Sequence, residues 1–325
     1  MKALILAAGL GTRLRPLTLV RPKVLVPLMG RSVLEFWVWR LAAEGYGAAA
    51  LNAYQGASRL EAEVRGRSWP IPVCVRTEPL LLGTGGGIRN LLDFFGDESF
   101  AVINGDIVCD ASLGALHEEH IDSGAGVSLL LHDCKPFNNV AVDGGGAVLG
   151  FGEEARKIAL RSPEVRLLAF TGIHFIDPDV VSELPPGEYA DIIPLYVKRI
   201  RSGFPPRAVV PGSLFWREMG SVDAYRALTH EFPTLPEGFL YPLKTGASVV
   251  AAPGARVSRD ARLKGVVVVG EGTTISPGCE IEDSILWDGV TVEPGARLRG
   301  CIVGDGVRVG GWRENEIVTE GGGNA

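Results

Sequence analysis

The chain has 325 residues, of which 46% are hydrophobic and 22% are charged, and its formal net charge is −6. This composition is that of an ordinary soluble globular protein, and the length favours two domains. The negative net charge argues against general binding to nucleic acid or to an anionic membrane surface.

The N-terminal region departs from this acidic balance. The first forty residues contain seven lysines and arginines and a single acidic residue, Glu35. A local basic region in an acidic chain indicates a small anionic ligand rather than a charged polymer. The five cysteines are scattered without metal-type spacing, and the apolar run before Gly9 is too short for a secretion signal. We therefore expect a cytoplasmic protein.

The first part of the chain alternates strand-like and helix-like segments. The patterns predict strands at 2–8, 71–76 and 100–103, and helices at 33–44 and 88–95. The helix at 33–44 begins with a capping box, Ser32 to Glu35. This alternation indicates a parallel sheet covered by helices, in which ligands bind beyond the carboxyl ends of the strands. Gly9 and Asp106 both follow such ends.

From about Val249 the pattern changes and the helix signals disappear. Apolar residues recur at intervals of six, with two steps of five, and glycines mark the corners between them. The recurring residues are Val257, Leu263, Val269, Ile275, Ile281, Leu286, Val292, Leu298, Val303 and Val309. This is the pattern of a hexapeptide-repeat parallel β-helix, which we predict over residues 246–312. We expect residues 233–245 to be a linker and residues 313–325 to be a flexible tail.

The segment after the first predicted strand is rich in glycine and arginine. A dinucleotide fingerprint requires a third glycine three residues after Gly11, and Leu14 stands there instead. The Gly-Lys-Ser/Thr ending of a P-loop is also missing. What remains is a glycine loop after a strand, which offers backbone N–H groups to phosphate and is followed by Arg13 and Lys23.

The string from Leu6 to Thr18, followed by Pro22 and Lys23, resembles the signature of the sugar-1-phosphate nucleotidyltransferases. That pattern is G-x-G-T-R-L-x-P-L-T with a following P-K. Family members that carry a β-helix, such as mannose-1-phosphate guanylyltransferases, are similar to this chain over nearly its full length. The resemblance implies an α/β fold with two domains. A Rossmann-like nucleotidyltransferase domain with a mixed, mostly parallel sheet would span 1–232, and a short left-handed parallel β-helix would follow.

The resemblance also implies roles for individual residues. The catalytic residues would be Arg13, Lys23 and Asp106, and the ligands of a Mg²⁺ cofactor, or of Mn²⁺, would be Asp106 and Glu218. The nucleotide-binding residues would be Leu6, Ala8, Gly9, Gly11, Thr12, Glu78, Gly83 and Thr84. The sugar-binding residues would be Asn139, Glu153, Thr171 and Gly172.

The match departs from the family at two places. The second metal ligand of the family lies in a Trp-x-Asp-x-Gly-Thr string, and here Glu218 replaces the aspartate. The extra methylene shifts the carboxylate, so Glu218 either changes the metal geometry or no longer binds metal. The family often has Glu-Lys-Pro in the sugar pocket, whereas this chain offers Arg156 or Lys157 as substitutes. The run after Gly83 is also similar to N-acetylmuramate-1-phosphate uridylyltransferases and heptose-1-phosphate guanylyltransferases.

The implied activity is transfer of a nucleoside monophosphate from a nucleoside triphosphate to a sugar 1-phosphate. We expect GTP with mannose or heptose 1-phosphate. The alternatives are a uridylyltransferase for an amino-sugar 1-phosphate and a catalytically weak regulatory subunit that binds nucleotide sugar. An additional acyltransferase activity is disfavoured because all five histidines precede the β-helix. The open ends of the β-helix favour a homo-oligomer.

Overall fold

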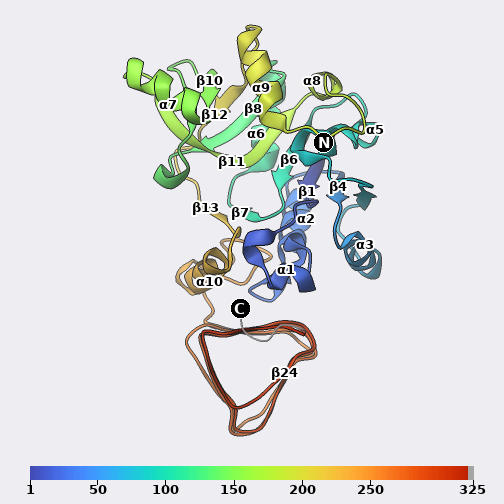
Figure 1. The fold of residues 1–325 in the computed structure, drawn as a ribbon, viewed down its shortest axis with the longest axis vertical. Coiled ribbons are helices and arrows are strands. Elements are labelled where there is room, and N and C mark those ends of the chain that lie inside the picture. Colours follow the sequence, from blue (N-terminus) through green and yellow to red (C-terminus); the bar gives the residue numbers. More distant parts are fainter. Residues whose placement is uncertain (321–325) are drawn as a thin grey trace. The chain divides into compact units, whose positions relative to one another are not determined.

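The computed structural model describes residues 1–320, which form two compact units (Figure 1). The first unit consists of Met1–Gly9 and Trp37–Trp216. The second unit combines Leu10–Phe36 with the chain from Arg217 onward. The basic signature segment therefore belongs to the same compact unit as the C-terminal region. Whether 1–232 and 246–312 are separate folding domains stays a prediction. No helix within residues 1–320 is both long and apolar enough to cross a membrane.

A nine-stranded mixed sheet forms the centre of the first unit, with the order β10-β9-β11-β6-β1-β4-β5; β8 pairs with β11, and β12 pairs with β8. The strands are β1 Lys2–Leu6, β4 Ala48–Ala53, β5 Val73–Thr77, β6 Phe100–Asn104, β8 Val127–His132, β9 Val140–Val142, β10 Val148–Phe151, β11 Arg166–Ile176 and β12 Arg207–Val209. Strands β6, β1, β4 and β5 run parallel, and β11 is antiparallel to β6. The continuous apolar runs of β1 and β6 are buried on both faces, as parallel strands require. The predicted Rossmann-like fold is confirmed.

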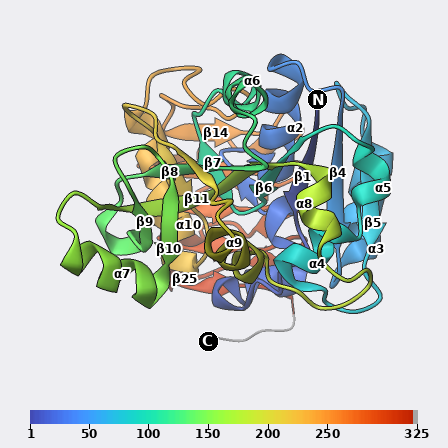
Figure 2. The ribbon, with the colours of Figure 1, turned by 90° about the horizontal axis from the view of Figure 1, so that it is seen from above.

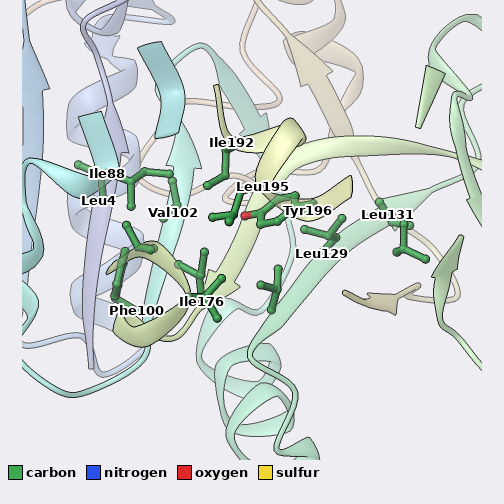
Figure 3. Packing of buried hydrophobic residues seen from close by; sticks show 14 of the residues in the cluster. Leu4, Ile88, Phe100, Val102, Leu129, Leu131, Ile176, Ile192, Leu195 and Tyr196 are labelled. Atoms are coloured by element: carbon green, nitrogen blue, oxygen red, sulfur yellow. The ribbon is translucent and has the colours of Figure 1, made fainter. Parts of the chain in front are cut away.

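Helices cover this sheet and close its hydrophobic core. They are α3 Ala57–Gly66, α4 Gly83–Arg89, α5 Leu92–Phe95, α6 Leu113–Ser123, α7 Gly152–Arg161, α8 Pro178–Ser182 and α9 Ile192–Arg201. Figure 3 shows Leu4, Phe100 and Val102 of the sheet in one buried cluster with Ile192 and Leu195 of α9. The helix predicted at 88–95 is instead two helices, α4 and α5, and the first begins five residues earlier than expected. The glycines of 83–87, which resemble a loop in sequence, lie inside α4.

The signature segment of the second unit folds as a series of short turns. Its elements are η1 Thr12–Leu14, α1 Leu17–Val20, η2 Lys23–Leu25, β2 Pro27–Leu28 and β3 Arg31–Ser32. The predicted capping box is present. The Ser32 backbone N–H donates to Glu35 Oε2 at 2.9 Å, and the Glu35 N–H donates to Ser32 Oγ at 3.1 Å. It starts α2 Val33–Ala43, one residue shorter than predicted.

The remaining elements before the C-terminal region are short. Strand β7 Ile107–Cys109 follows β6, and β13 Trp216–Glu218 carries the carboxylate that departs from the family pattern. Helix α10 Val222–Glu231 begins at Ser221, whose side chain accepts a hydrogen bond from the Ala224 N–H at 3.2 Å. The turn η4 Phe232–Thr234 ends it.

The C-terminal region consists of stacked coils with three parallel sheets, and Figure 1 shows these coils end-on as a triangle. The first sheet contains β14 Val249–Ala251, β17 Val267–Val269, β20 Ile285–Leu286, β23 Ile302–Val303 and β26 Ile317–Val318. The second contains β15 Arg256–Val257, β18 Thr274–Ile275, β21 Thr291–Val292 and β24 Arg308–Val309. The third contains β16 Arg262–Lys264, β19 Glu280–Glu282, β22 Arg297–Arg299 and β25 Trp312–Glu314. The predicted recurring residues from Val269 to Val309 line its core, consistent with a left-handed β-helix.

The β-helix continues beyond its predicted end. Strands β25 and β26 pair with β22 and β23, so residues 313–320 complete a coil where a flexible tail was expected. Asn315 makes the intervening turn at φ 56°, and its N–H donates to the Arg299 carbonyl at 2.8 Å. The charged residues between Trp312 and Ile317 obscured the six-residue spacing in the sequence. The rest of the predicted tail, 321–325, lies outside the described residues.

Candidate functional site

In the first unit, the carboxyl ends of β1 and β6 bring two of the predicted residues together. Leu6 and Asn104 are register partners, and the Gly105 N–H donates to the Leu6 carbonyl at 3.0 Å. Asp106 follows directly and is half-buried. Leu6 and Asp106 therefore lie at one edge of the parallel sheet, the edge where α/β proteins bind ligands.

A buried hydrogen-bond network fixes the segments beside this edge. The Ala7 N–H donates to Asn52 Oδ1 at 2.7 Å, and Asn52 Nδ2 donates to Glu78 Oε1 at 2.8 Å. The Leu82 N–H donates to Glu78 Oε2 at 3.0 Å. Burial raises the pKa of the Glu78 carboxyl, against the opposing effect of the bonds from Leu82 and Asn52. Glu78 thus ties the start of the glycine loop to the start of α4.

Asn52 was missed by sequence reasoning, although it is 2% exposed and joins three segments. Its sequence signal is weak: one polar residue near the end of the apolar strand β4. Both carboxylate oxygens of Glu78 are engaged by protein donors. Glu78 therefore links the segments of Asn52 and Leu82, while its predicted contact with the nucleotide stays a prediction.

The glycines of α4 allow close packing rather than flexibility. A Cβ atom at Gly86 would lie 2.4 Å from the Glu188 carbonyl oxygen, and one at Gly83 would lie 2.8 Å from that of Ala190. Gly83 also has a φ of 72°, which disfavours other residues. The Ile192 N–H donates to Thr84 Oγ1 at 3.0 Å, so Thr84 caps the first turn of α9. Figure 2 shows α4 and α9 side by side.

Thr171 and Gly172, two predicted sugar-binding residues, lie where β11 bulges. The Thr171 hydroxyl donates to the Leu130 carbonyl at 2.8 Å and accepts from the Ile173 N–H at 3.1 Å. Gly172 has a φ of 83°, and a Cβ atom there would lie 2.4 Å from Asn104 Nδ2. Only glycine fits this position. Gly172 is consequently packed against Asn104, two residues before Asp106.

Of the other predicted sugar-binding residues, Glu153 lies in the first turn of α7, and Asn139 precedes β9 and contacts the start of α7. The Asn139 N–H donates to the Leu168 carbonyl at 3.0 Å, and its carbonyl accepts from the Gly152 N–H at 2.7 Å. Both side chains are exposed, and Glu153 lies 3.9 Å from Arg156. Arg156, considered as a substitute for the family's lysine, is therefore beside one of the predicted sugar-binding residues.

In the second unit, the signature glycine and arginine are held by local contacts. Gly11 has a φ of 58°, and its carbonyl accepts a 2.8 Å hydrogen bond from the Thr18 hydroxyl. A Cβ atom at Gly11 would lie 2.7 Å from Thr18 Cγ2. The close contact of these two signature residues is therefore a physical reason for a glycine at position 11. Thr12 and Arg13 follow in the turn η1, and Lys23 begins the turn η2.

The structure brings Arg13 and Glu218 together. Arg13 Nη2 lies 3.7 Å from Glu218 Oε2, and the two side chains are 69% and 21% exposed. A Cβ atom at Gly220 would lie 2.1 Å from Glu218 Oε2 and 2.8 Å from Arg13 Nη2, so Gly220 packs against the ends of both side chains. The carboxylate that departs from the family pattern is thus an ion-pair partner of the predicted catalytic arginine.

The donor chemistry of the predicted metal ligands fits a hard cation. Asp106 of the first unit and Glu218 of the second unit both offer carboxylate oxygens, which suit Mg²⁺. Within residues 1–320, no three His, Cys, Asp or Glu side chains cluster in a way that would hold a metal ion by themselves. Mg²⁺ characteristically binds through one or two carboxylates together with substrate phosphates, so the chemistry of each carboxylate, taken by itself, fits this ion.

Comparisons with known proteins cover both parts of the chain. The family model described as Nucleotidyl transferase matches residues 2–233, and the one described as GMPPB C-terminal domain matches residues 245–320. A mannose-1-phosphate guanylyltransferase of Mycobacterium tuberculosis is 30% identical over 294 residues, which is 88% of this chain and 79% of the relative.

Two uridylyltransferases are similar over about two thirds of the chain. An N-acetylmuramate α-1-phosphate uridylyltransferase of Caulobacter vibrioides is 30% identical over 68% of this chain and 93% of the relative. A UTP–glucose-1-phosphate uridylyltransferase of Synechocystis is 30% identical over 69% of this chain, and the match spans 61% of that relative. The family model over most of the chain, together with these relatives, shows that the chain belongs to the nucleotidyl transferase family.

Proposed function

We propose that the chain transfers GMP from GTP to mannose 1-phosphate or heptose 1-phosphate, giving a GDP-sugar and pyrophosphate. The observation that carries this proposal is the similarity to a mannose-1-phosphate guanylyltransferase over 88% of the chain, which includes part of the C-terminal region. A D-glycero-α-D-manno-heptose 1-phosphate guanylyltransferase of Aneurinibacillus thermoaerophilus, 31% identical over 42% of this chain, supports the second sugar. The coarser activity, nucleotidyl transfer to a sugar 1-phosphate, is common to all of these relatives.

The reaction brings two anions together, and the proposed site residues reduce the repulsion between them. A sugar 1-phosphate is largely dianionic at neutral pH, because its second pKa is about 6. Its oxygen can therefore attack the α-phosphorus without a general base, and pyrophosphate leaves. Arg13 and Lys23 offset the negative charge of the phosphates, and the Gly9–Gly11 loop offers backbone N–H donors. Relatives of this family generally use a divalent metal ion; Mg²⁺ bound to Asp106 and Glu218 would neutralise phosphate charge.

A second candidate is a uridylyltransferase for an amino-sugar 1-phosphate. The N-acetylmuramate α-1-phosphate uridylyltransferase matches this chain over 93% of its own length. Under either candidate, we expect the predicted nucleotide-binding residues Glu78 and Gly83 to contribute to the choice of nucleobase.

A third candidate is a weakly active regulatory subunit. The ion pair between Arg13 and Glu218 favours it, because a paired guanidinium offers less net charge to a phosphate.

Pyrophosphate release with a panel of nucleoside triphosphates and sugar 1-phosphates, in Mg²⁺ and in Mn²⁺, tests all three candidates. We expect GTP with mannose or heptose 1-phosphate to give the highest kcat/KM. Higher turnover with UTP and an amino-sugar 1-phosphate would establish the second candidate instead. Absence of turnover with every pair, combined with binding of a nucleotide sugar, would establish the third.

We also propose a cytoplasmic homo-oligomer that assembles through the β-helix. The five cysteines lie within the described residues and are unbridged, as in a reducing compartment. Trp312 and Val257 of the β-helix are 60% and 38% exposed, which gives its surface apolar contacts to cover. Sedimentation of the Trp312→Glu variant should show a lower mass than the unmodified chain, and an unchanged mass would contradict this assembly.

A further inference from the structure

Arg21 stands between the signature residues Arg13 and Lys23, at a position that the signature leaves open. Its Nε donates to Asp305 Oδ2 at 2.7 Å and its Nη2 donates to Asp305 Oδ1 at 2.5 Å. The same Nη2 donates to Asp288 Oδ2 at 2.5 Å. The side chain is 12% exposed, so these are well-shielded, charge-assisted bonds from the signature segment to the β-helix.

The two aspartates occupy equivalent corners of successive β-helix coils. Glu271, Asp288 and Asp305 are each 17 residues apart, and the Glu271 N–H donates to Asp288 Oδ1 at 2.8 Å. Successive coils stack about 4.8 Å apart, so the carboxylates of Asp288 and Asp305 repel each other unless a cation lies between them. Arg21 supplies that cation. The corner is therefore built to receive one arginine.

A second set of contacts connects the same corner to Pro27, which follows Lys23 in the sequence. Trp287 is fully buried, and the Arg21 guanidinium lies 5.3 Å from its ring centre. Trp287 Nε1 donates to the Tyr225 hydroxyl oxygen at 3.3 Å, and that hydroxyl donates to the Pro27 carbonyl at 2.6 Å. Arg21 and Pro27 lie on either side of Lys23 in the sequence. Arg21 contacts Trp287 and Asp288 directly, and Pro27 is connected to Trp287 through the Tyr225 hydroxyl.

Lys23 itself begins a tight turn between these two anchors. The Leu25 N–H donates to the Pro22 carbonyl at 2.8 Å, and the Val26 N–H donates to the Lys23 carbonyl at 3.1 Å. A lysine ammonium on a flexible stem binds phosphate well only if its backbone is fixed, because misplacement by an ångström can cost about 100-fold in rate.

We propose that the β-helix corner of Trp287, Asp288 and Asp305 positions the Lys23 turn, and that Arg21 is the positioning residue that connects them. This inference deepens the proposed function, on which the role of Lys23 rests. The β-helix then contributes to catalysis within one chain, in addition to any part in assembly.

The Arg21→Gln variant tests this connection, with Arg199→Gln as its matched control. Arg199 is also mostly buried, at 19% exposed; it pairs with Glu183 at 3.0 Å, and its guanidinium lies 5.8 Å from the Phe204 ring. With both variants held well below their unfolding temperatures, kcat/KM for the sugar 1-phosphate should fall about 10-fold to 100-fold in Arg21→Gln. Arg199→Gln should stay within about twofold of the unmodified chain. Equal kcat/KM in folded Arg21→Gln and the unmodified chain would overturn the proposal.

Hydrogen exchange supplies a readout that does not depend on turnover. The amides of Leu25 and Val26 should exchange at least about 10-fold faster in Arg21→Gln than in Arg199→Gln. The double variant Asp288→Asn/Asp305→Asn should reproduce this change from the β-helix side, and it replaces Arg21→Gln if that variant does not fold. Unchanged exchange would refute the inference. An unmodified chain without turnover but with these exchange results would refute the proposed function and leave the positioning of the turn established.

Discussion

The two compact units hold their candidate site residues, and the residues that contact them, by different kinds of interaction. In the first unit, Asn52, Glu78 and Thr84 are fixed by short hydrogen bonds inside closely packed secondary structure. In the second unit, Arg21 is held by short ion pairs with Asp288 and Asp305, and Arg13 lies 3.7 Å from the Glu218 carboxylate. Hydrogen bonds inside closely packed structure are little affected by salt, but added side-chain volume disrupts them. Ion pairs depend on the charge of both partners, and salt screens those that are exposed to solvent. The difference predicts which perturbation damages each unit.

Removing an exposed cation of the second unit should damage activity without damaging stability. Arg13→Ala should lower kcat/KM about 100-fold to 1,000-fold, because charge stabilisation at the reacting phosphate is lost. Its unfolding free energy should change by less than about 0.5 kcal/mol, because the side chain is largely exposed. Arg15→Ala, in the same turn and also exposed, is the control and should keep its activity. A large loss in both variants would mean that general charge, and not Arg13, matters.

Acid should destabilise the first unit through its buried histidines. Burial, with the nearby charge of His120, lowers the pKa of His117 to about 4 and that of His174 to about 3. Both are neutral when folded, so their contribution is complete above about pH 6.5 and is lost as the pH falls toward 4. Urea unfolding should show a loss of a few kcal/mol over this range.

His174→Leu sharpens the acid prediction. Neither ring nitrogen of His174 has a hydrogen-bond partner within the described part of the chain, so leucine removes a buried titrating group without breaking such a bond. The pH dependence of the variant should be visibly shallower than that of the unmodified chain. An identical slope would show that other groups account for the acid sensitivity.

Added volume should damage α4 of the first unit. Gly86→Ala should lower the unfolding free energy by about 1–3 kcal/mol, because the new methyl group overlaps the Glu188 carbonyl. Gly144→Ala is the control: a Cβ atom there meets no described atom within 4 Å, and the change should be within about 0.5 kcal/mol. Chemical denaturation measures both. Equal stabilities would mean that α4 shifts to accommodate the methyl group.

The smallest expected changes in stability should depend on salt in the second unit and not in the first. Thr84→Ala removes the cap of α9 and should cost about 1 kcal/mol at any ionic strength. Glu218→Gln removes a partly exposed ion pair and should cost less than about 1 kcal/mol, with the difference vanishing in high salt. Thermal unfolding at low and high salt compares them. A salt-independent loss in Glu218→Gln would contradict the ion-pair account of the second unit.

Local signals in the sequence were sufficient for much of the fold. The apolar runs of β1 and β6, the capping box at Ser32 and the six-residue spacing of the β-helix each depend on neighbours close in the chain. The basic segment and Asp106 could be picked out for the same reason, since strand ends and glycine turns are local features.

The contacts that sequence reasoning missed join distant segments. Asn52 meets Ala7 across 45 residues, and Arg21 meets Asp288 and Asp305 across 267 and 284 residues. The packing role of the α4 glycines could not be predicted because the carbonyls of Glu188 and Ala190, which lie against them, are about a hundred residues further on. The last coil was missed because charged residues interrupt its apolar spacing.

The corner formed by Trp287, Asp288 and Asp305 limits how this chain can be recombined. A β-helix transplanted from a relative would have to present an aromatic residue and two acidic corners one coil apart to receive Arg21. A chimera that keeps Arg21 but lacks those corners would leave a buried guanidinium unpaired, which is strongly unfavourable. Successful exchange of C-terminal regions therefore requires that Arg21 and the corner of Trp287, Asp288 and Asp305 be exchanged together.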